Sequence, residues 1–392
     1  MMVPELQGAL LDDLQATEPW VRSIYDPFMG SGTVLLESMF RGLEFHGTDI
    51  NPLAVLLTQV KSSPPPGAEA KAAVESVYVI AKRIREVESH DFLHRDKWFN
   101  PKVTHDLSKL RAVISDVTAL PMRQFLWICL AETVRRVSNS RMSTFKLHAY
   151  DSDTLKSRQP DALQTFHTVG IGNSRRAAAH WRRMSALGAV PNPTLLRASV
   201  FDQFGAPRSV DAVMTSPPYG DNHTTVPYGQ HSYLPLQWME VDDIPGTFES
   251  RLLQTPASLD TASLGGSRSY RRDLIESLPN EIASTKHIFE SLAGSASLEA
   301  KAASFIHDYR ESLKAVSERL KLGGVSFFTL GERRIKGIEL PLVAMTREIL
   351  EAIGHAHVAT VTRQILGKKM AGRNSSGSTM VSEQVLVMRK KP

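Results

Sequence analysis

The sequence predicts an α/β fold: a doubly wound, Rossmann-like sheet, interrupted by a mainly helical insertion and closed by a C-terminal antiparallel hairpin. Three observations support this fold. Residues 20–60 read as strand, glycine-rich turn, helix, strand and acidic residue, the opening of a nucleotide-binding βαβ unit. Residues 68–140 follow a helical period. Residues 357–365 and 383–388 alternate β-branched and polar side chains, as paired strands do.

Length and composition indicate an ordinary globular chain. Its 392 residues can hold one large α/β domain with an insertion, or two domains. Hydrophobic residues make up 42% and charged residues 22% of the chain, and no apolar run approaches the roughly 20 residues that cross a bilayer. The single cysteine, Cys129, excludes an intramolecular disulfide and a cysteine-based zinc site. Since no secretory signal is visible, we expect a cytoplasmic protein without a membrane partner.

The net charge of +5 is unevenly distributed. Residues 61–200 hold 22 Lys and Arg against 12 Asp and Glu, and the remaining residues hold 24 against 29. A basic segment inserted into a mildly acidic body is a candidate surface for a polyanion. A solvated helical bundle with uneven charge is the alternative.

Residues 1–62 predict the first part of the sheet domain. A strand at 21–25 runs into the glycine-rich turn at 26–33, and a second strand at 43–48 is followed by Asp49-Ile50-Asn51-Pro52. Apolar residues at helical spacing predict three helices: residues 4–16, 34–41 and 53–61.

Residues 63–193 predict a mainly helical, basic insertion that is a candidate DNA-recognition region. Pro64-Pro65-Pro66-Gly67 marks its boundary. The clearest helices are 70–87 and 122–137, whereas 141–170 are polar and less regular. Asn173 or Ser174 is suited to cap a further helix that runs to Leu187.

Residues 194–392 predict the second part of the sheet domain. Residues 220–300 read as loop-rich, and Gly323-Gly324 is expected to end a helix. The expected helices are 305–322 and 341–353, and the expected strands are 194–200, 210–215, 325–330, 357–365 and 383–388, the last two forming the C-terminal hairpin.

The glycine-rich turn is a candidate cofactor site. Gly30 and Gly32 let the backbone approach a ligand, and Ser31 and Thr33 can donate hydrogen bonds or cap the helix. The pattern is neither G-x-G-x-x-G nor a P-loop. Asp49, at the end of the second strand, is suited to two ribose hydroxyls. A structural turn with a capping aspartate is the competing interpretation.

Asp202 follows the strand predicted at 194–200, so we expect it at the same edge of the sheet. There its carboxylate could accept from an adenine amino group. An ordinary loop aspartate explains it nearly as well.

The most specific signal is Ser216-Pro217-Pro218-Tyr219, which follows the apolar run 210–214. The prolines fix φ and remove N–H donors, which leaves carbonyls free to accept hydrogen bonds. The Ser216 hydroxyl and the Pro217 carbonyl could accept from an exocyclic amine and free its lone pair, while Tyr219 stacks on the base. Such a base must leave the duplex. A proline-rich surface turn is the bland alternative.

Two groups of basic residues are candidate contacts for a phosphate backbone. One consists of two arginine doublets near the end of the insertion, with Trp181 between them, and a solvated amphipathic face explains it equally well. The other lies in the loop of the C-terminal hairpin. The histidines do not have the spacing of a metal site, so no metal is expected. The basic residues are Arg175, Arg176, Arg182 and Arg183, and Lys368, Lys369 and Arg373.

On these motifs, the chain resembles the amino-methyltransferases that modify DNA at cytosine N4 or adenine N6. Residues 26–33 are similar to their cofactor motif, Asp-Pro-Phe-x-Gly-Ser-Gly-Thr, and residues 216–219 to their catalytic motif. The serine form of that motif is more typical of the cytosine-N4 members. The resemblance is good over 20–60 and 194–225 and extends to 305–390 in pattern only.

The resemblance implies S-adenosyl-L-methionine as cofactor and double-stranded DNA as partner, in a restriction-modification or defence setting with a restriction nuclease. Gly30 and Gly32 would line the methionine part of the cofactor, Asp49 its ribose and Asp202 its adenine. The implied cofactor-binding residues are Asp26, Phe28, Gly30, Ser31, Gly32, Thr33, Asp49, Asn51 and Asp202, and the implied catalytic residues are Ser216, Pro217, Pro218 and Tyr219.

Two departures from the family pattern affect these expectations. The cofactor motif precedes the catalytic motif with the basic insertion between them, so target recognition is expected in 61–193, in 221–300 or in both. The family usually has a Lys/Phe/Pro-containing segment before the first helix that helps to hold the cofactor's carboxylate, whereas here the chain begins almost at that helix, with Val3-Pro4-Glu5-Leu6. Lack of that segment would weaken cofactor binding or require a partner chain. The alternatives are an RNA guanine-N2 methyltransferase and a catalytically silent DNA-binding subunit.

Overall fold

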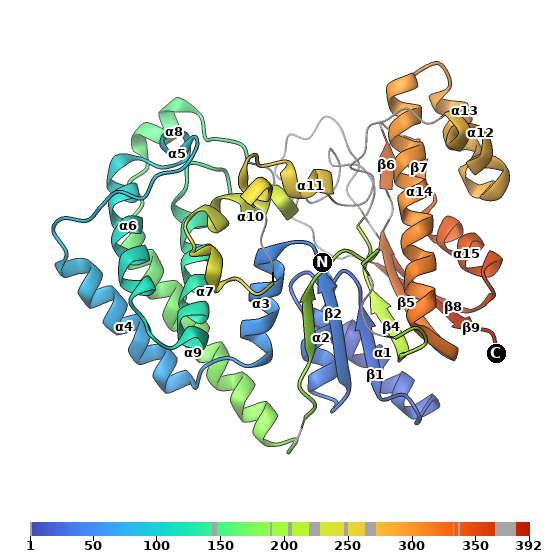
Figure 1. Cartoon of the computed structure of the whole chain (residues 1–392), viewed down its shortest axis with the longest axis horizontal. Coiled ribbons are helices and arrows are strands. Elements are labelled where there is room, and N and C mark those ends of the chain that lie inside the picture. Colours follow the sequence, from blue (N-terminus) through green and yellow to red (C-terminus); the bar gives the residue numbers. More distant parts are fainter. Residues whose placement is uncertain are drawn as a thin grey trace.

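Seven strands form one mixed sheet in the order β3-β2-β1-β4-β5-β9-β8 (Figure 1). The computed structural model describes residues 2–142, 147–188, 190–202, 206–218, 228–246, 250–262, 272–331, 333–335, 338–364 and 382–392. Strands β1 to β5 are parallel, and β9 is antiparallel to both β5 and β8. The strands are β1 Ser23–Asp26, β2 Glu44–Asp49, β3 Thr194–Arg197, β4 Val210–Thr215, β5 Leu320–Gly331, β8 His355–Gln364 and β9 Ser382–Lys390, and a separate hairpin pairs β6 Arg333–Ile335 with β7 Ile338–Leu340.

The fold class expected from the sequence is confirmed. The βαβ opening is present, and the C-terminal strands pair antiparallel as predicted. One helical layer covers one face of the sheet: its apolar residues, such as Leu11 and Leu35, contact Ile24 and Met214 of the strands. Its helices are α1 Pro4–Thr17, α2 Thr33–Met39 and α3 Pro52–Ser62.

A second helical layer covers the opposite face of the sheet. Ile306 and Tyr309 of its longest helix, α14, pack with Phe328 and Leu386 of the strands. The central strands β1 and β4 are therefore completely buried between two helical layers, whereas the edge strands β3 and β8 are partly exposed. The helices of this layer are α12 Arg272–Glu281, α13 Lys286–Leu292, α14 Ala296–Arg319 and α15 Leu342–Ala352, with a 3₁₀ turn at Ala283–Thr285.

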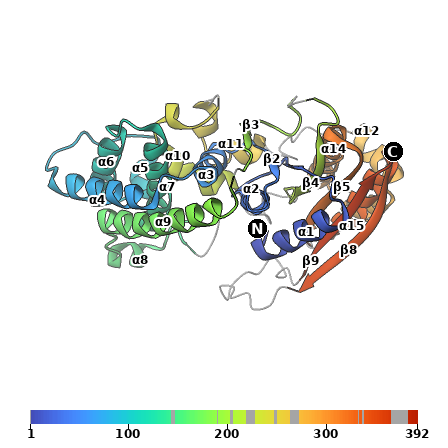
Figure 2. The ribbon, with the colours of Figure 1, turned by 90° about the horizontal axis from the view of Figure 1, so that it is seen from below.

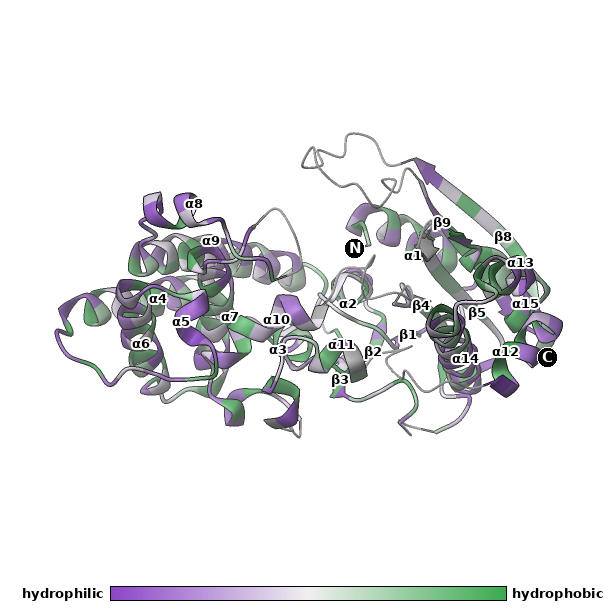
Figure 3. Cartoon of the chain, turned by 90° about the horizontal axis from the view of Figure 1, so that it is seen from above, coloured by the Kyte–Doolittle hydropathy of each residue, from purple (hydrophilic) through white to green (hydrophobic). Residues whose placement is uncertain are grey.

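The remaining helices form a separate helical lobe with its own core. Figure 2 shows α4 and α9 side by side in it, and Figure 3 shows that its helices carry both hydrophobic and hydrophilic residues. Helix α3 joins the two cores, since Val55 lies in the sheet core and Leu56 in the lobe core. The lobe helices are α4 Gly67–Arg83, α5 Arg95–Trp98, α6 Pro101–Ser115, α7 Leu120–Val137, α8 Ser152–Ser157, α9 Ala162–Ser185, α10 Tyr228–Gln237 and α11 Ser258–Ala262, with 3₁₀ turns at Val241–Asp243 and Ser250–Leu253.

The lobe contains more of the chain than the predicted insertion. Tyr233, Trp238 and Leu259 lie in its core together with Phe166 and other residues of 63–193. The described residues of 228–246 and 250–262 therefore pack mainly with the insertion, while Gly246 lies beside Arg197 of β3. The division of the chain at residues 62 and 193 stays a prediction about domains.

Several boundaries differ from the sequence prediction. Helix α9 begins at Ala162, with the Asp161 carboxylate accepting from the Gln164 N–H at 2.8 Å, so Asn173 and Ser174 lie inside this helix and do not cap it. Gly323 and Gly324 lie within β5, because α14 already ends at Arg319. The described parts of 220–300 are mostly short helices, where the sequence suggested loops.

Candidate active site

The two sequence motifs meet at one edge of the sheet. β1 and β4 are parallel neighbours, with Ile24 opposite Ala212 and Tyr25 opposite Val213. The turn after Asp26 and the turn after Thr215 therefore both leave the carboxyl edge of the sheet side by side.

The glycine turn adopts the left-handed backbone that its glycines allow. Gly30 has a φ of +48° and Gly32 a φ of +74°. A Cβ on Gly32 would lie 2.7 Å from Cγ2 of Thr58, whereas a Cβ on Gly30 would meet only the Phe28 carbonyl oxygen at 3.7 Å. Gly32 is thus required by packing against α3, and Gly30 borders open space, as a ligand-facing glycine must.

Asp49 ends β2 and fixes the glycine turn. Its Oδ2 accepts from the Gly30 N–H at 2.9 Å, and its Oδ1 accepts from the Asn51 N–H at 2.8 Å. Desolvation raises the pKa of this carboxyl to about 6, although part of the side chain reaches solvent. Asn51 caps α3 by accepting from the Leu53 N–H at 3.1 Å and donates through Nδ2 to the Ser232 hydroxyl of α10 at 3.0 Å.

Asp26 ends β1 and is completely buried. Its Oδ1 accepts from the Thr215 hydroxyl at 2.6 Å and from the Phe28 N–H at 3.1 Å. Its Oδ2 has no hydrogen-bond partner among the described residues. Burial raises the pKa of this carboxyl to about 7, against the opposing effect of the Thr215 hydrogen bond.

Two residues that the sequence analysis missed contact the site. Thr215 joins the ends of β1 and β4 through its hydrogen bond to Asp26. The sequence feature that could have identified it is a hydroxyl residue at the end of an apolar strand. Lys61, in the last turn of α3, donates from Nζ to the Ser31 carbonyl at 2.6 Å. Burial, and then the charge of Arg176, lower the pKa of this ammonium group. Lys61 thus supports the glycine turn from the α3 side, while Thr33 begins α2.

The tetrapeptide Ser216-Pro217-Pro218-Tyr219 follows a strand that is buried throughout, β4. Pro217 is buried, and Ser216 and Pro218 are partly exposed beside the glycine turn. Tyr219 lies outside the described residues.

Asp202 lies beyond the end of β3, which stops at Arg197 and is shorter than predicted. The Ala198 N–H donates to the Asp49 carbonyl at 3.2 Å, so the chain leaves β3 next to Asp49. Asp202 itself is exposed, and its carboxylate accepts from the Ser199 N–H at 2.6 Å. Asp202 therefore lies in a local turn that follows the carboxyl end of β3.

The arginine doublets lie on α9, which contains no acidic residue. All four side chains are exposed. The guanidinium carbon of Arg183 lies 3.7 Å from the centre of the Phe40 ring. Phe40 follows α2 and precedes β2, so this end of α9 is beside the amino edge of the sheet, opposite Ser216. Lys368, Lys369 and Arg373 lie outside the described residues.

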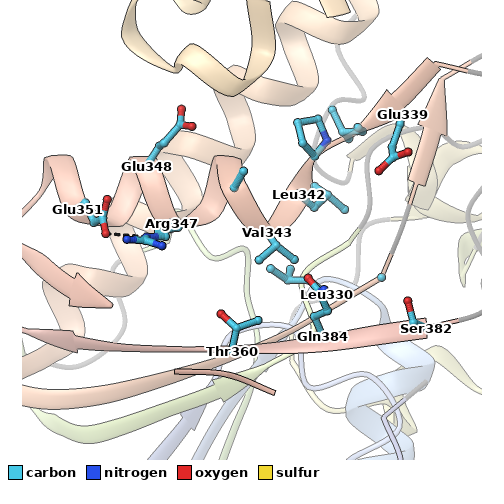
Figure 4. Close-up of a pocket in the computed structure, with 14 residues that line it drawn as sticks. Leu330, Glu339, Leu342, Val343, Arg347, Glu348, Glu351, Thr360, Ser382 and Gln384 are labelled. Atoms are coloured by element: carbon cyan, nitrogen blue, oxygen red, sulfur yellow. Dashed lines mark hydrogen bonds and ion pairs between the residues drawn. The ribbon is translucent and has the colours of Figure 1, made fainter. Parts of the chain in front are cut away.

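A cavity of about 630 Å³ lies between α15 and the strands β5, β8 and β9 (Figure 4). Leu330, Leu342 and Val343 line it, and its mouth carries an ion pair of 2.8 Å between Arg347 and Glu351. None of the predicted site residues lines this cavity. Over the described ranges, no group of His, Cys, Asp and Glu has the arrangement of a metal site, and no helix is long and apolar enough to span a bilayer.

Comparison with known proteins indicates the class of protein that this site belongs to. No model of a known protein family matches the chain. The chain is 28% identical to the "Type II methyltransferase M.MvaI" of Kocuria varians over 415 residues, which cover 99% of this chain and 89% of the relative. A solved structure of a candidate methyltransferase from Thermoplasma acidophilum aligns at 14% identity over 56% of this chain and 54% of its own, and its TM-score of 0.21 carries no argument. The nearly full-length similarity supports a methyltransferase.

Proposed function

We propose that this chain transfers a methyl group from S-adenosyl-L-methionine to the exocyclic amine of a base flipped out of DNA, with cytosine N4 favoured over adenine N6. The observation that carries the proposal is the convergence of the Gly30 turn and the Ser216 turn on neighbouring ends of β1 and β4. The serine form of the catalytic motif favours cytosine. The similarity to a Type II methyltransferase supports DNA as the substrate and a restriction-modification setting.

The residues around the glycine turn fit S-adenosyl-L-methionine. The orphaned, buried Oδ2 of Asp26 is suited to the cofactor's ammonium group, because a buried carboxylate oxygen without a partner is costly. Asp49, at the end of β2, is suited to the ribose hydroxyls, and Asp202 to the adenine edge. Phe28, Ser31, Thr33 and Asn51 belong to the same turns. The cofactor supplies an activated methyl group on a positively charged sulfur.

Ser216 and Pro217 would hold the target amine. The Ser216 hydroxyl and the Pro217 carbonyl accept hydrogen bonds from the two N–H groups, which turns the nitrogen lone pair away from the ring. Pro218 keeps the turn rigid, and Tyr219 would stack on the base. Because the two turns emerge from adjacent strands, methyl donor and amine are held close, and proximity supplies most of the acceleration. Methyl transfer to an amine needs no covalent adduct between enzyme and base. Cys129, which is buried in the core of the helical lobe, is therefore not expected to be catalytic.

DNA contacts are proposed for the helical lobe and the basic residues. The helical lobe adjoins the carboxyl edge through Asn51 and Ser232, and it is the proposed region of target recognition. The α9 arginines lie toward the other edge, so we assign them phosphate contacts away from the target base. Lys368, Lys369 and Arg373 are proposed phosphate contacts as well.

The proposal is tested by incubating the full chain with labelled S-adenosyl-L-methionine and duplex DNA, digesting the DNA to nucleosides and identifying the product by mass spectrometry. N4-methylcytosine is the expected product, and N6-methyladenine would correct only the base. Label that enters tRNA but not DNA would favour the guanine-N2 alternative. Calorimetry of the isolated chain with the cofactor separates the enzyme from a silent subunit, which would show no binding.

A further inference from the structure

The ends of β1 and β4 are linked by a hydrogen bond between two buried side chains. Thr215, the last residue of β4, donates its hydroxyl to Asp26, the last residue of β1, at 2.6 Å. Both side chains are completely excluded from solvent. The residue after Thr215 begins the catalytic turn, and the residue after Asp26 begins the cofactor turn. Any shift of one strand end against the other must break this bond.

The two oxygens of the Asp26 carboxylate differ in their hydrogen bonds. Oδ1 accepts from Thr215 and from the Phe28 N–H, which lies in the cofactor turn itself. Oδ2 is buried and has no partner among the described residues. Such an oxygen is a place for a ligand's donor, because leaving it unpaired costs about 1–3 kcal/mol.

We propose that Thr215 is a positioning residue: by holding Oδ1 of Asp26, it ties the catalytic turn to the cofactor turn and leaves Oδ2 for the ammonium group of the cofactor. This inference rests on the proposed function. It assigns a role to a residue outside both motifs, and it connects the methyl-donor half of the site with the methyl-acceptor half.

The proposal has a consequence for pH that a purely structural threonine would not have. The cofactor's ammonium group requires the ionised form of Asp26, whose pKa lies near 7, so affinity should rise as pH increases through that value. The charged or titratable groups that act on Asp26 are Asp49, from the end of β2, and the neighbouring Tyr25 phenol. The α-amino group at a peptide N-terminus loses its proton near pH 7.7–8.0, and with a similar value for the amine of the cofactor the informative range is below about pH 7.5.

The test is calorimetric titration of the full chain with S-adenosyl-L-methionine between pH 5.5 and 7.5. Thr215→Val removes the hydroxyl at nearly constant volume, so the pKa of Asp26, and with it the midpoint of the affinity curve, should rise by about one unit, as expected for one charge-assisted hydrogen bond. Within the measured range this upward shift should appear as a loss of affinity that narrows from about tenfold at pH 5.5 to about threefold at pH 7.5. Thr215→Ser keeps the hydroxyl and should retain the wild-type midpoint. Asp26→Asn should remove the pH dependence.

Thr133→Val is the matched control. Thr133 is also completely buried, and its hydroxyl donates to the Cys129 carbonyl at 2.8 Å within α7 of the helical lobe. This variant should bind with the wild-type midpoint, and thermal melting checks the folding of all variants.

The outcomes separate the inference from the proposed function. A Thr215→Val midpoint equal to that of wild type, or affinity lost equally at every pH, would overturn the positioning role while leaving the proposed function standing. Should Thr215→Val fail to fold, a shifted midpoint in Thr215→Ser would contradict the role of the hydroxyl, and an unshifted one beside a flat Asp26→Asn curve would support it. Wild-type protein that binds no cofactor at any pH would overturn both.

Discussion

The contact between Gly32 and Thr58 allows the two glycines of the cofactor turn to be tested separately. In Gly32→Ala, the new Cβ lies 2.7 Å from Cγ2 of Thr58 and 3.4 Å from Cδ2 of Leu35, in a backbone of φ +74°. The left-handed backbone costs about 1–2 kcal/mol for a residue with a Cβ. Overpacking adds about 1–3 kcal/mol. Gly32→Ala should therefore destabilise the fold by about 2–5 kcal/mol.

Thr58→Ser isolates the steric part of this cost. Serine lacks the Cγ2 methyl but keeps the hydroxyl that donates to the Ala54 and Val55 carbonyls, each at 2.9 Å. In the Thr58→Ser background, Gly32→Ala should cost only the backbone contribution of about 1–2 kcal/mol. Gly30→Ala, with no close contact, should also cost only about that much.

The assay is urea denaturation followed by circular dichroism, with the four proteins of the Gly32 and Thr58 double-mutant cycle compared at one temperature. Gly32→Ala should lower the urea midpoint more when residue 58 is threonine than in the Thr58→Ser background. If Gly32→Ala costs the same in both backgrounds, contact with Thr58 is not the reason for a glycine at position 32. Gly30→Ala should weaken cofactor binding more than it weakens the fold.

Three further outcomes follow from the structure. Ser216→Ala should reduce turnover far more than cofactor affinity, measured by single-turnover kinetics and calorimetry, and an equal loss of both would contradict its catalytic role. Changing Arg182 and Arg183 to Gln should lower the slope of log K against log salt by about two and leave single-turnover rates at saturating DNA unchanged, whereas an unchanged slope would assign this face of α9 to packing and solvation. Asp243 is buried and accepts from Arg123 and from Trp127 Nε1, at 2.6 Å each. Burial alone would raise its pKa but these hydrogen bonds lower it, so Asp243→Asn should destabilise the lobe by about 3 kcal/mol at neutral pH and make less difference in acid, where the wild-type carboxyl is protonated; an equal effect in acid would argue against the ion pair.

The sequence predicted those parts of the fold that depend on local pattern. The strand at 210–215 has the predicted bounds, because an apolar run between turn residues leaves little choice. The start of α9 was missed because Gly170 and Gly172 weaken the helical pattern. In the structure, Gly170 is needed for packing: a Cβ there would lie 2.5 Å from Val74 of α4. The close packing of Gly170 against Val74 thus outweighs the low helix propensity of glycine.

The candidate site could be predicted where it consists of motifs and not where it depends on strand register. The glycine turn and the Ser216 turn are readable from sequence because each carries its own backbone chemistry. The bond between Asp26 and Thr215 joins residues 189 positions apart. It requires the pairing of β1 with β4, which no local pattern contains. Lys61 was missed for the same reason, since only the packing of α3 brings it to Ser31.

The position of β9 constrains the order in which the protein can mature on the ribosome. This strand, Ser382–Lys390, is inserted between β5 and β8, although it is synthesised after both. Until residues 382–390 have been made, β5 exposes an unpaired apolar border that invites association with other nascent chains. Completion of the sheet therefore waits for the synthesis of residues 382–390, and a product terminated before them would be expected to aggregate.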